Sequence, residues 1–166
     1  TFLRQDPDII MLGEIRDTET ARMAVRSSLT GHLIFSTIHT NSAWGCVARL
    51  MDMGLHSFLI ADTLLLCMAQ RLVRLLCPHC KCGMNAEEGG LAHLAGVPRR
   101  LFRAVGCEAC YYTGYSGRKA VYEVLPVDSR LALAIRNQET EIAALLKERG
   151  IKTLRESALQ LLDYGL

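Results

Sequence analysis

The segment around which the fold is organised reads Asp6-Pro7-Asp8-Ile9-Ile10-Met11-Leu12-Gly13-Glu14-Ile15-Arg16-Asp17. Its four apolar residues, 9–12, follow one another without polar residues between them. A short apolar run of this kind is typical of a strand buried on both faces, although periodicity alone does not distinguish it from a buried helix. Pro7 before the run and Gly13 after it favour the strand.

Charged residues follow this strand at its carboxyl end. Glu14, Arg16 and Asp17 lie where open α/β sheets place their ligand crevice. A carboxylate at that place can hold a Mg²⁺-bound water or orient a water for attack on a phosphate. The alternative is a strand that simply ends in solvated charges.

A helix and a second strand are predicted next. Asp17 and Thr18 can cap a helix that ends near Gly31, and residues 33–36 form another short apolar strand. Strand, helix and strand in this order make a parallel βαβ unit. The two strands would therefore bring Glu14 and His39 to the same edge of the sheet, which favours a functional site over solvated strand ends.

The rest of the chain is predicted to contain a cysteine- and glycine-rich region, one more strand and several helices. Thr153 and Glu156 are spaced as a helix capping box, and Gly165 suits a helix stop. A domain border is expected close to Cys77. The strand is expected at about 118–125, and the helices at about 43–52, 57–75, 129–137, 140–148 and 153–163.

Composition indicates a folded protein of a reducing compartment. With 166 residues, 50% hydrophobic and 22% charged, the chain can bury a core and is not a disordered tail. The most apolar region, 58–76, contains charged residues and is not expected to span a membrane. Seven cysteines without an export signal favour metal or thiols over disulfides, hence a cytosolic protein. Because the chain begins at Thr1 rather than Met, a native amino terminus is expected upstream.

Two CxxC pairs, Cys77/Cys80 and Cys107/Cys110, are separated by 26 residues. Two such pairs can close a tetrahedral Zn²⁺ site, which would be structural because no coordination position stays open. Thiol redox chemistry is the competing interpretation, and Cys82 could replace Cys80 as a ligand. His79 is expected to be exposed or outside the ligand set. The remaining cysteines, Cys46 and Cys67, fall in helical patterns and are expected to pack in the core.

A nucleic-acid-binding function is the main rival, because basic and aromatic residues follow the first cysteine pair and could bind a single strand. The formal charge of +2 is too small to support it, acidic residues offset the basic ones, and no RNA-binding signature is present. We therefore expect no nucleic-acid partner. The residues concerned are Arg99, Arg100, Arg103, Arg118, Lys119, Tyr111, Tyr112 and Tyr115.

Four motifs, in the same order over nearly the whole chain, resemble those of the secretion ATPases, the general secretory pathway protein E and type IV pilus assembly protein B group. Residues 3–17 resemble the Walker B segment, and residues 30–41 resemble the histidine box. Residues 69–80 are similar to the stretch that enters the tetracysteine motif, and residues 114–123 to the segment after its second cysteine pair.

The resemblance implies an α/β fold: a partial RecA-like parallel sheet with flanking helices, a small tetracysteine zinc-binding subdomain and C-terminal helices. The corresponding domains are 1–76, 77–117 and 118–166. It also implies a homo-hexameric motor that hydrolyses ATP with Mg²⁺ and powers type II secretion or type IV pilus assembly. Such a motor lies in the cytoplasm, peripheral to the inner membrane, on the cytoplasmic parts of membrane platform proteins.

Residue by residue, the resemblance makes Glu14 the Walker B glutamate that polarises the attacking water, and His39 the histidine near the γ-phosphate. It makes the four paired cysteines the zinc ligands: Cys77, Cys80, Cys107 and Cys110. The expected neighbours of the nucleotide and Mg²⁺ are Gly13, Arg16, Asp17, His32 and Thr37.

The phosphate-binding Walker A loop, Gly-x-x-x-x-Gly-Lys-Ser/Thr, does not occur in this sequence. In the family it lies upstream of the position of Thr1. Without its backbone donors and lysine, the chain alone is predicted neither to bind nor to hydrolyse ATP appreciably. The alternative function from another class is a zinc-stabilised interaction module that only recruits partners.

Overall fold

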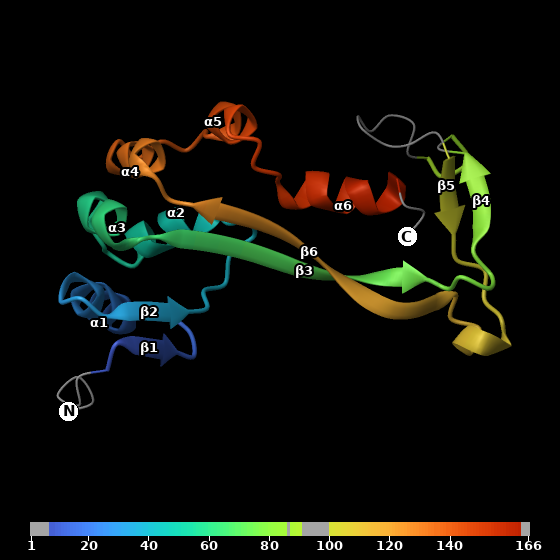
Figure 1. Cartoon of the computed structure of the whole chain (residues 1–166), viewed down its shortest axis with the longest axis horizontal. Coiled ribbons are helices and arrows are strands. Elements are labelled where there is room, and N and C mark those ends of the chain that lie inside the picture. Colours follow the sequence, from blue (N-terminus) through green and yellow to red (C-terminus); the bar gives the residue numbers. More distant parts are fainter. Residues whose placement is uncertain (1–6, 86, 91–99, 164–166) are drawn as a thin grey trace. The chain divides into compact units, whose positions relative to one another are not determined.

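The computed structural model describes residues 7–85, 87–90 and 100–163 (Figure 1). The expectations for residues 1–6, for Arg99 and for a helix stop at Gly165 lie outside the described residues. In chain order the elements are β1 (Ile9–Leu12), α1 (Thr18–Leu29), β2 (Leu33–Ser36), α2 (Gly45–Asp52), α3 (Ser57–Thr63), β3 (Leu66–Leu76), β4 (Cys82–Asn85), β5 (Arg100–Arg103), η2 (Glu108–Cys110), β6 (Tyr115–Pro126), α4 (Ser129–Arg136), α5 (Ala143–Glu148) and α6 (Leu154–Asp163).

The predicted βαβ unit is confirmed. β1 and β2 pair in parallel, with Ile9 opposite Leu33 and Leu12 opposite Ser36, and α1 connects them. Asp17 caps α1 as expected, because its carboxylate accepts a hydrogen bond from the backbone N–H of Thr20. The two strands therefore end at one edge, and the segments that follow them start side by side.

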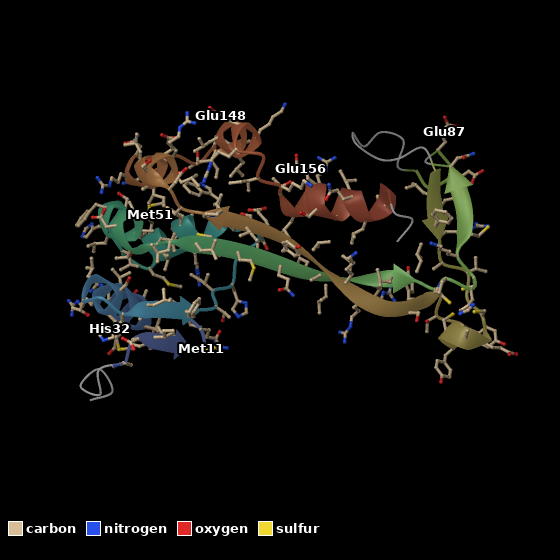
Figure 2. All side chains as sticks on the ribbon, in the orientation of Figure 1. Met11, His32, Met51, Glu87, Glu148 and Glu156 are labelled. Atoms are coloured by element: carbon tan, nitrogen blue, oxygen red, sulfur yellow. The ribbon has the colours of Figure 1, made fainter. Side chains whose placement is uncertain are left out.

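The expectation that the first strand is buried on both faces is wrong for the described chain. Ile10 is buried, but Ile9 and Met11 on the other face are 59% and 82% exposed. Their partners in register, Leu33 and Phe35, are exposed as well, and Figure 2 shows the Met11 side chain on β1. Burial of both faces needs a layer on each side, and the described residues supply a layer on one side only.

The expected helix over 57–75 is also wrong, because α3 ends at Thr63 and β3 begins at Leu66. Leu64 already has extended dihedral angles, φ −80° and ψ 113°. Along β3, Cys67 and Ala69 are buried, whereas the residues between and before them are exposed, which is the period of a strand. β3 pairs with β6, so a contact distant in sequence decides between two structures that the local apolar pattern permits.

The other elements differ from expectation mainly at their boundaries. α2 and α5 begin two and three residues later than predicted, and β6 begins three residues earlier. The capping box at α6 is confirmed: Thr153 N–H donates to Glu156 Oε2 at 2.8 Å, and Glu156 N–H donates to Thr153 Oγ1 at 3.3 Å. The antiparallel pair β4–β5 was not expected from the sequence.

The chain forms two compact units, and each has its own buried residues. Unit 1 comprises the described residues up to Ala69 together with Val124–Ile151, and unit 2 comprises Gln70–Glu123 and the described residues from Lys152. The core of unit 1 includes the fully buried side chains Ile60, Leu131 and Ile135. The expected division into 1–76, 77–117 and 118–166 follows the motifs instead, and it stays a prediction. None of the helices within 7–85, 87–90 and 100–163 has the length and hydropathy of a membrane span.

Candidate functional site

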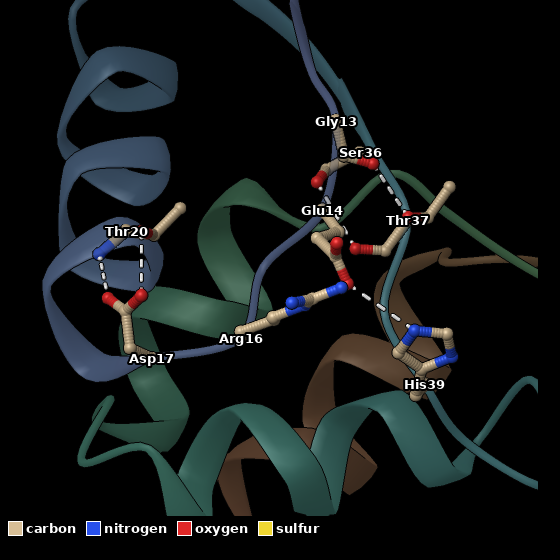
Figure 3. Close-up of polar contacts among 8 residues, drawn as sticks. All are labelled: Gly13, Glu14, Arg16, Asp17, Thr20, Ser36, Thr37 and His39. Carbon is tan, nitrogen blue, oxygen red and sulfur yellow. Dashed lines mark hydrogen bonds and ion pairs between the residues drawn. The ribbon is translucent and has the colours of Figure 1, made fainter.

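Glu14 and His39 lie together at the carboxyl edge of the β1–β2 sheet (Figure 3). Each follows a strand of the parallel pair by two or three residues, so the strand register sets their separation. His39 Nε2 is 3.3 Å from Glu14 Oε2. The Glu14 side chain is 29% exposed and that of His39 is 87% exposed. The pair is thus open to a ligand on the histidine side.

Arg16 is the second partner of Glu14. Its Nε lies 2.5 Å from Glu14 Oε2, an atom that is buried and has charged contacts rather than well-aligned hydrogen bonds. The contact with Arg16 lowers the pKa of Glu14, burial opposes it, and His39 lowers the pKa further. Glu14 is therefore a carboxylate at neutral pH, as a water-orienting base must be.

Backbone and hydroxyl contacts fix the two segments that carry this pair. Thr37 Oγ1 donates to the carbonyl of Gly13 at 2.7 Å (Figure 3). Ile15 N–H donates to the carbonyl of Thr37 at 2.9 Å. These bonds continue the contact between the strands beyond their ends. They hold Glu14 and His39 in place without using either side chain.

Asp17 and His32 are not brought to Glu14. Asp17 is engaged at the amino end of α1, where its carboxylate accepts from Thr20 N–H at 2.8 Å. His32, labelled in Figure 2, precedes β2, whereas His39 follows that strand. The His32 Nδ1 is 3.0 Å from the carbonyl oxygen of Ser27. Their expected part in nucleotide binding stays a prediction.

An open pocket of about 370 Å³ lies beside the Glu14–His39 pair and is lined by Ile15, Arg16, His39 and Arg49. The two guanidinium groups give it a cationic lining that suits an anionic ligand. Sequence reasoning missed Arg49, which comes from α2. No local motif marks it, because its place at the pocket depends on how α2 packs.

The four paired cysteines converge within unit 2. Their Sγ atoms all lie within 4.8 Å of one another. The separations are 3.9 Å for Cys77–Cys107, 3.9 Å for Cys80–Cys110 and 3.8 Å for Cys107–Cys110. Among the residues that the structure describes, no other group of three or more potential ligands gathers in this way. Cys82 and His79 are exposed and lie outside the group.

Backbone amides point at these sulfurs. Cys110 Sγ accepts from the N–H groups of Cys107 and Gly114, and Cys80 Sγ accepts from Gly106 N–H. Burial works to raise the pKa of Cys110, but the two N–H donors together with the side chains of Cys107 and Cys80 bring the pKa to about 6. Burial raises the pKa of Cys107 to about 11. Without a cation, Cys107 therefore stays a protonated thiol at neutral pH.

Two glycines allow the tight turns on either side of the second cysteine pair, Cys107 and Cys110. Gly106 has φ +111°, and a Cβ there would lie 2.7 Å from the carbonyl oxygen of Tyr112. Gly114 has φ +79°, and its Cβ would lie 2.6 Å from Cβ of Ala104. Neither residue was singled out from the sequence. The signal that could have found them is a glycine next to, or four residues beyond, a CxxC pair.

The family model "Type II/IV secretion system protein" matches residues 1–166. The chain belongs to this family. Relatives include the type II secretion system protein E of Klebsiella pneumoniae, 49% identical over 150 residues, which are 90% of this chain and 30% of the relative. The type II secretion system ATPase E of Vibrio cholerae is 50% identical over 169 residues, 99% of this chain and 34% of the relative.

The type IV pilus assembly ATPase PilB of Thermus thermophilus is 45% identical over 165 residues, 95% of this chain and 19% of the relative. Among solved structures, the pilus retraction motor PilT with bound ADP has a TM-score of 0.67 and 25% identity, covering 99% of this chain and 38% of that one. The ATPase DotB of Legionella pneumophila has a TM-score of 0.63 and 20% identity, covering 99% and 37%. The chain thus spans about a third of the length of the type II secretion relatives, and its mixed α/β fold is that of the PilT and DotB structures.

Proposed function

We propose that this chain is the part of a secretion or pilus ATPase that carries its catalytic glutamate and histidine. The observation that carries the proposal is the 3.3 Å contact between Glu14 and His39 at the carboxyl edge of two parallel strands. Ligands of open α/β sheets bind at this edge. Two relatives named as ATPases, the PilB of Thermus thermophilus and the ATPase E of Vibrio cholerae, match nearly all of the chain at 45% and 50% identity.

In this proposal Glu14 orients and deprotonates the water that attacks the γ-phosphate of ATP. Mg²⁺, held with ATP, supplies neutralisation of the phosphate charge. His39 faces the phosphate from the exposed side of the pair. Arg16 and Arg49 line the adjoining pocket and attract the anionic substrate. Because Arg16 contacts Glu14 directly, Arg16 must shift before the carboxylate can accept a proton.

The proposed parent is a homo-hexamer in the cytoplasm, on inner-membrane platform proteins, with a RecA-like sheet that is more extensive than the β1–β2 pair. The larger sheet is supported by the exposed apolar face formed by Ile9, Met11, Leu33 and Phe35. Covering such a face with another layer removes apolar surface from water and stabilises the fold.

A phosphate-release assay tests the proposal. The longer protein that we propose contains this chain is expected to hydrolyse ATP, and the 166-residue chain is not, since its sequence lacks the Walker A loop. Turnover by the isolated chain at the rate of the longer protein would show that the phosphate site is made differently. Absence of turnover in both would refute the ATPase assignment.

We also propose that Cys77, Cys80, Cys107 and Cys110 bind one structural Zn²⁺. Zn–S bonds of about 2.3 Å in a tetrahedron separate the sulfurs by about 3.8 Å. Three of the six Sγ–Sγ distances are 3.8–3.9 Å and fit that geometry, and all six are within 4.8 Å. Metal analysis of the purified chain is expected to find about one zinc per chain. A folded, metal-free protein would contradict the assignment.

A second candidate function, a docking module, is favoured by one observation. Tyr111 and Tyr112 follow the second cysteine pair, are 89% and 72% exposed, and both have left-handed dihedral angles. Tyrosine is enriched among the residues that contribute most to binding at protein interfaces. This role is compatible with the motor, because a platform protein could bind there. Tyr111→Ser in the longer protein would then weaken binding to the platform and leave ATP turnover unchanged.

A further inference from the structure

Two cysteines that take no part in the metal cluster lie in direct contact. Cys46 comes from α2 and Cys67 from β3, and both belong to unit 1. The Cys46 thiol donates towards Cys67 Sγ, and the two sulfurs are 3.0 Å apart. This is closer than the 3.8–3.9 Å separations within the metal cluster. The side chains are 7% and 4% exposed, so packing holds the sulfurs together.

A metal does not account for this contact. Among the described residues, the only group of three or more potential ligands is the four-cysteine cluster of unit 2. Two thiols in contact, by contrast, are the starting point for a disulfide. An S–S bond of about 2.05 Å requires the sulfurs to approach by about 1 Å, which small side-chain rotations on two adjoining elements can supply.

We propose that Cys46 and Cys67 are a modification site that hydrogen peroxide oxidises to an intrachain disulfide. One thiol loses its proton and its sulfur attacks a peroxide oxygen, which gives a sulfenic acid and one water. The sulfur of the other thiol then attacks the sulfenic sulfur, forms the S–S bond and expels the oxygen as a second water. Two electrons pass from the two sulfurs to the peroxide, and both thiol protons end in water.

Burial sets the kinetic behaviour of this site. Peroxide reaches the sulfurs only through transient opening of the packing, so oxidation is slower than that of the exposed Cys82. Once formed, the bond ties α2 to β3. α2 begins six residues after His39 and carries Arg49, which lines the pocket beside Glu14. The disulfide would therefore restrain one wall of the candidate site.

Peptide mapping of the 166-residue chain tests the proposal. The chain is treated with excess peroxide well beyond the time needed to oxidise Cys82 fully, remaining thiols are alkylated, and the protein is digested with trypsin. Peptides 27–49 and 50–71 are expected to be recovered joined, two hydrogen atoms lighter than their sum once methionine sulfoxide oxygens in 50–71 are subtracted, and dithiothreitol should separate them. Cys82→Ser should keep the joined product, because Cys82 lies on β4 and is exposed.

Recovery of Cys46 and Cys67 as alkylated thiols, as separate sulfinic acids, or joined to cysteines of the metal cluster would overturn the proposal. A second measurement uses Trp44, the only tryptophan, which lies in unit 1. Oxidation should raise the thermal transition of its fluorescence by about 5–10 °C. Cys46→Ala should show no such rise. If the unsubstituted chain had the same transition temperature before and after oxidation, the inference that the disulfide restrains α2 would be wrong.

Discussion

The charge of Glu14 depends on its contacts with Arg16 and His39 and on the burial of its Oε2 atom. Its carboxylate must be ionised to act as a base, and Arg16 and His39 together keep its pKa below the ordinary value of 4.5. The same Arg16 contact competes with a water for the carboxylate. For the proposed role, Glu14 therefore has the required negative charge, but Arg16 must move away before a water can bind the carboxylate.

Arg16→Ala is expected to raise the pKa of Glu14, because it removes the largest cause of the lowering. Carbon-13 NMR titration of the Glu14 carboxyl in the 166-residue chain measures this directly. Arg49→Ala is the matched control, since Arg49 lines the same pocket and makes no contact with Glu14 that contributes to the shift. An unchanged Glu14 titration in Arg16→Ala would show that the contact does not persist in solution.

Cys80 and Cys82 offer a matched pair for the zinc proposal. Cys80 Sγ lies in the cluster, 3.9 Å from Cys110 Sγ, whereas Cys82 is exposed on β4. Cys80→Ser is expected to lower the zinc content well below one per chain, and Cys82→Ser is expected to leave it unchanged. Atomic absorption on both purified variants gives the answer. Equal zinc in the two would mean that Cys82 can replace Cys80 as the ligand.

At the scale of elements, the sequence predicted what local chemistry determines. The β1–α1–β2 unit is confirmed because its strands are short apolar runs between turn residues and its helix has an acidic cap. The capping box of α6 is confirmed for the same reason. β3 was mistaken for helix because Leu64–Leu76 lacks glycine and proline, and pairing with β6, about fifty residues later, decides its structure.

In the candidate site too, the sequence predicted the residues that local structure positions and missed those that packing positions. Glu14 and His39 could be brought together from the sequence, since each follows a strand of one βαβ unit. Arg49 could not, because its approach depends on the packing of α2. Exposure of Met11 also escaped prediction, since an apolar run does not reveal which layers are present to cover it.

Asp17 gives the cap of α1 a measurable pH dependence. The hydrogen bonds from Thr20 lower its pKa below the usual 3.8, so its stabilisation is complete above that pH and is lost as the pH falls through the lowered pKa. Asp17→Ala is expected to lower the melting temperature by about 2–4 °C at neutral pH. The difference from the unsubstituted chain should shrink below pH 3.8.

Asp17→Asn is the control for this prediction, measured by circular dichroism in the same pH series. Asparagine is an equally good cap but does not titrate, so the variant should lose little stability at neutral pH. If Asp17→Ala melted at the same temperature as the unsubstituted chain, the contribution of the cap to α1 would be negligible.

At the scale of the whole chain, two units differ in what stabilises them. Unit 1 has fully buried apolar side chains such as Leu131 and Ile135, while unit 2 contains the cysteine cluster. A region with few large apolar residues gains folding free energy from a bound metal. Metal removal should therefore affect the two units unequally.

Hydrogen exchange measures this difference. Treatment with a strong zinc chelator is expected to abolish amide protection in β4, β5 and the segment around η2, and to leave α1 and α4 protected. Addition of Zn²⁺ should restore the lost protection. Equal loss of protection in both units would show that they unfold together, and unchanged protection would show that the cluster folds without metal.

The central claim is that Glu14 performs the water activation of an ATP-hydrolysing motor. The most direct measurement is steady-state ATP hydrolysis by the longer protein with Glu14→Gln, which preserves shape and removes the basic carboxylate. Turnover is expected to fall at least about 100-fold, while Glu19→Gln, an exposed position on α1, should keep the unsubstituted rate. Undiminished turnover in Glu14→Gln would contradict the account.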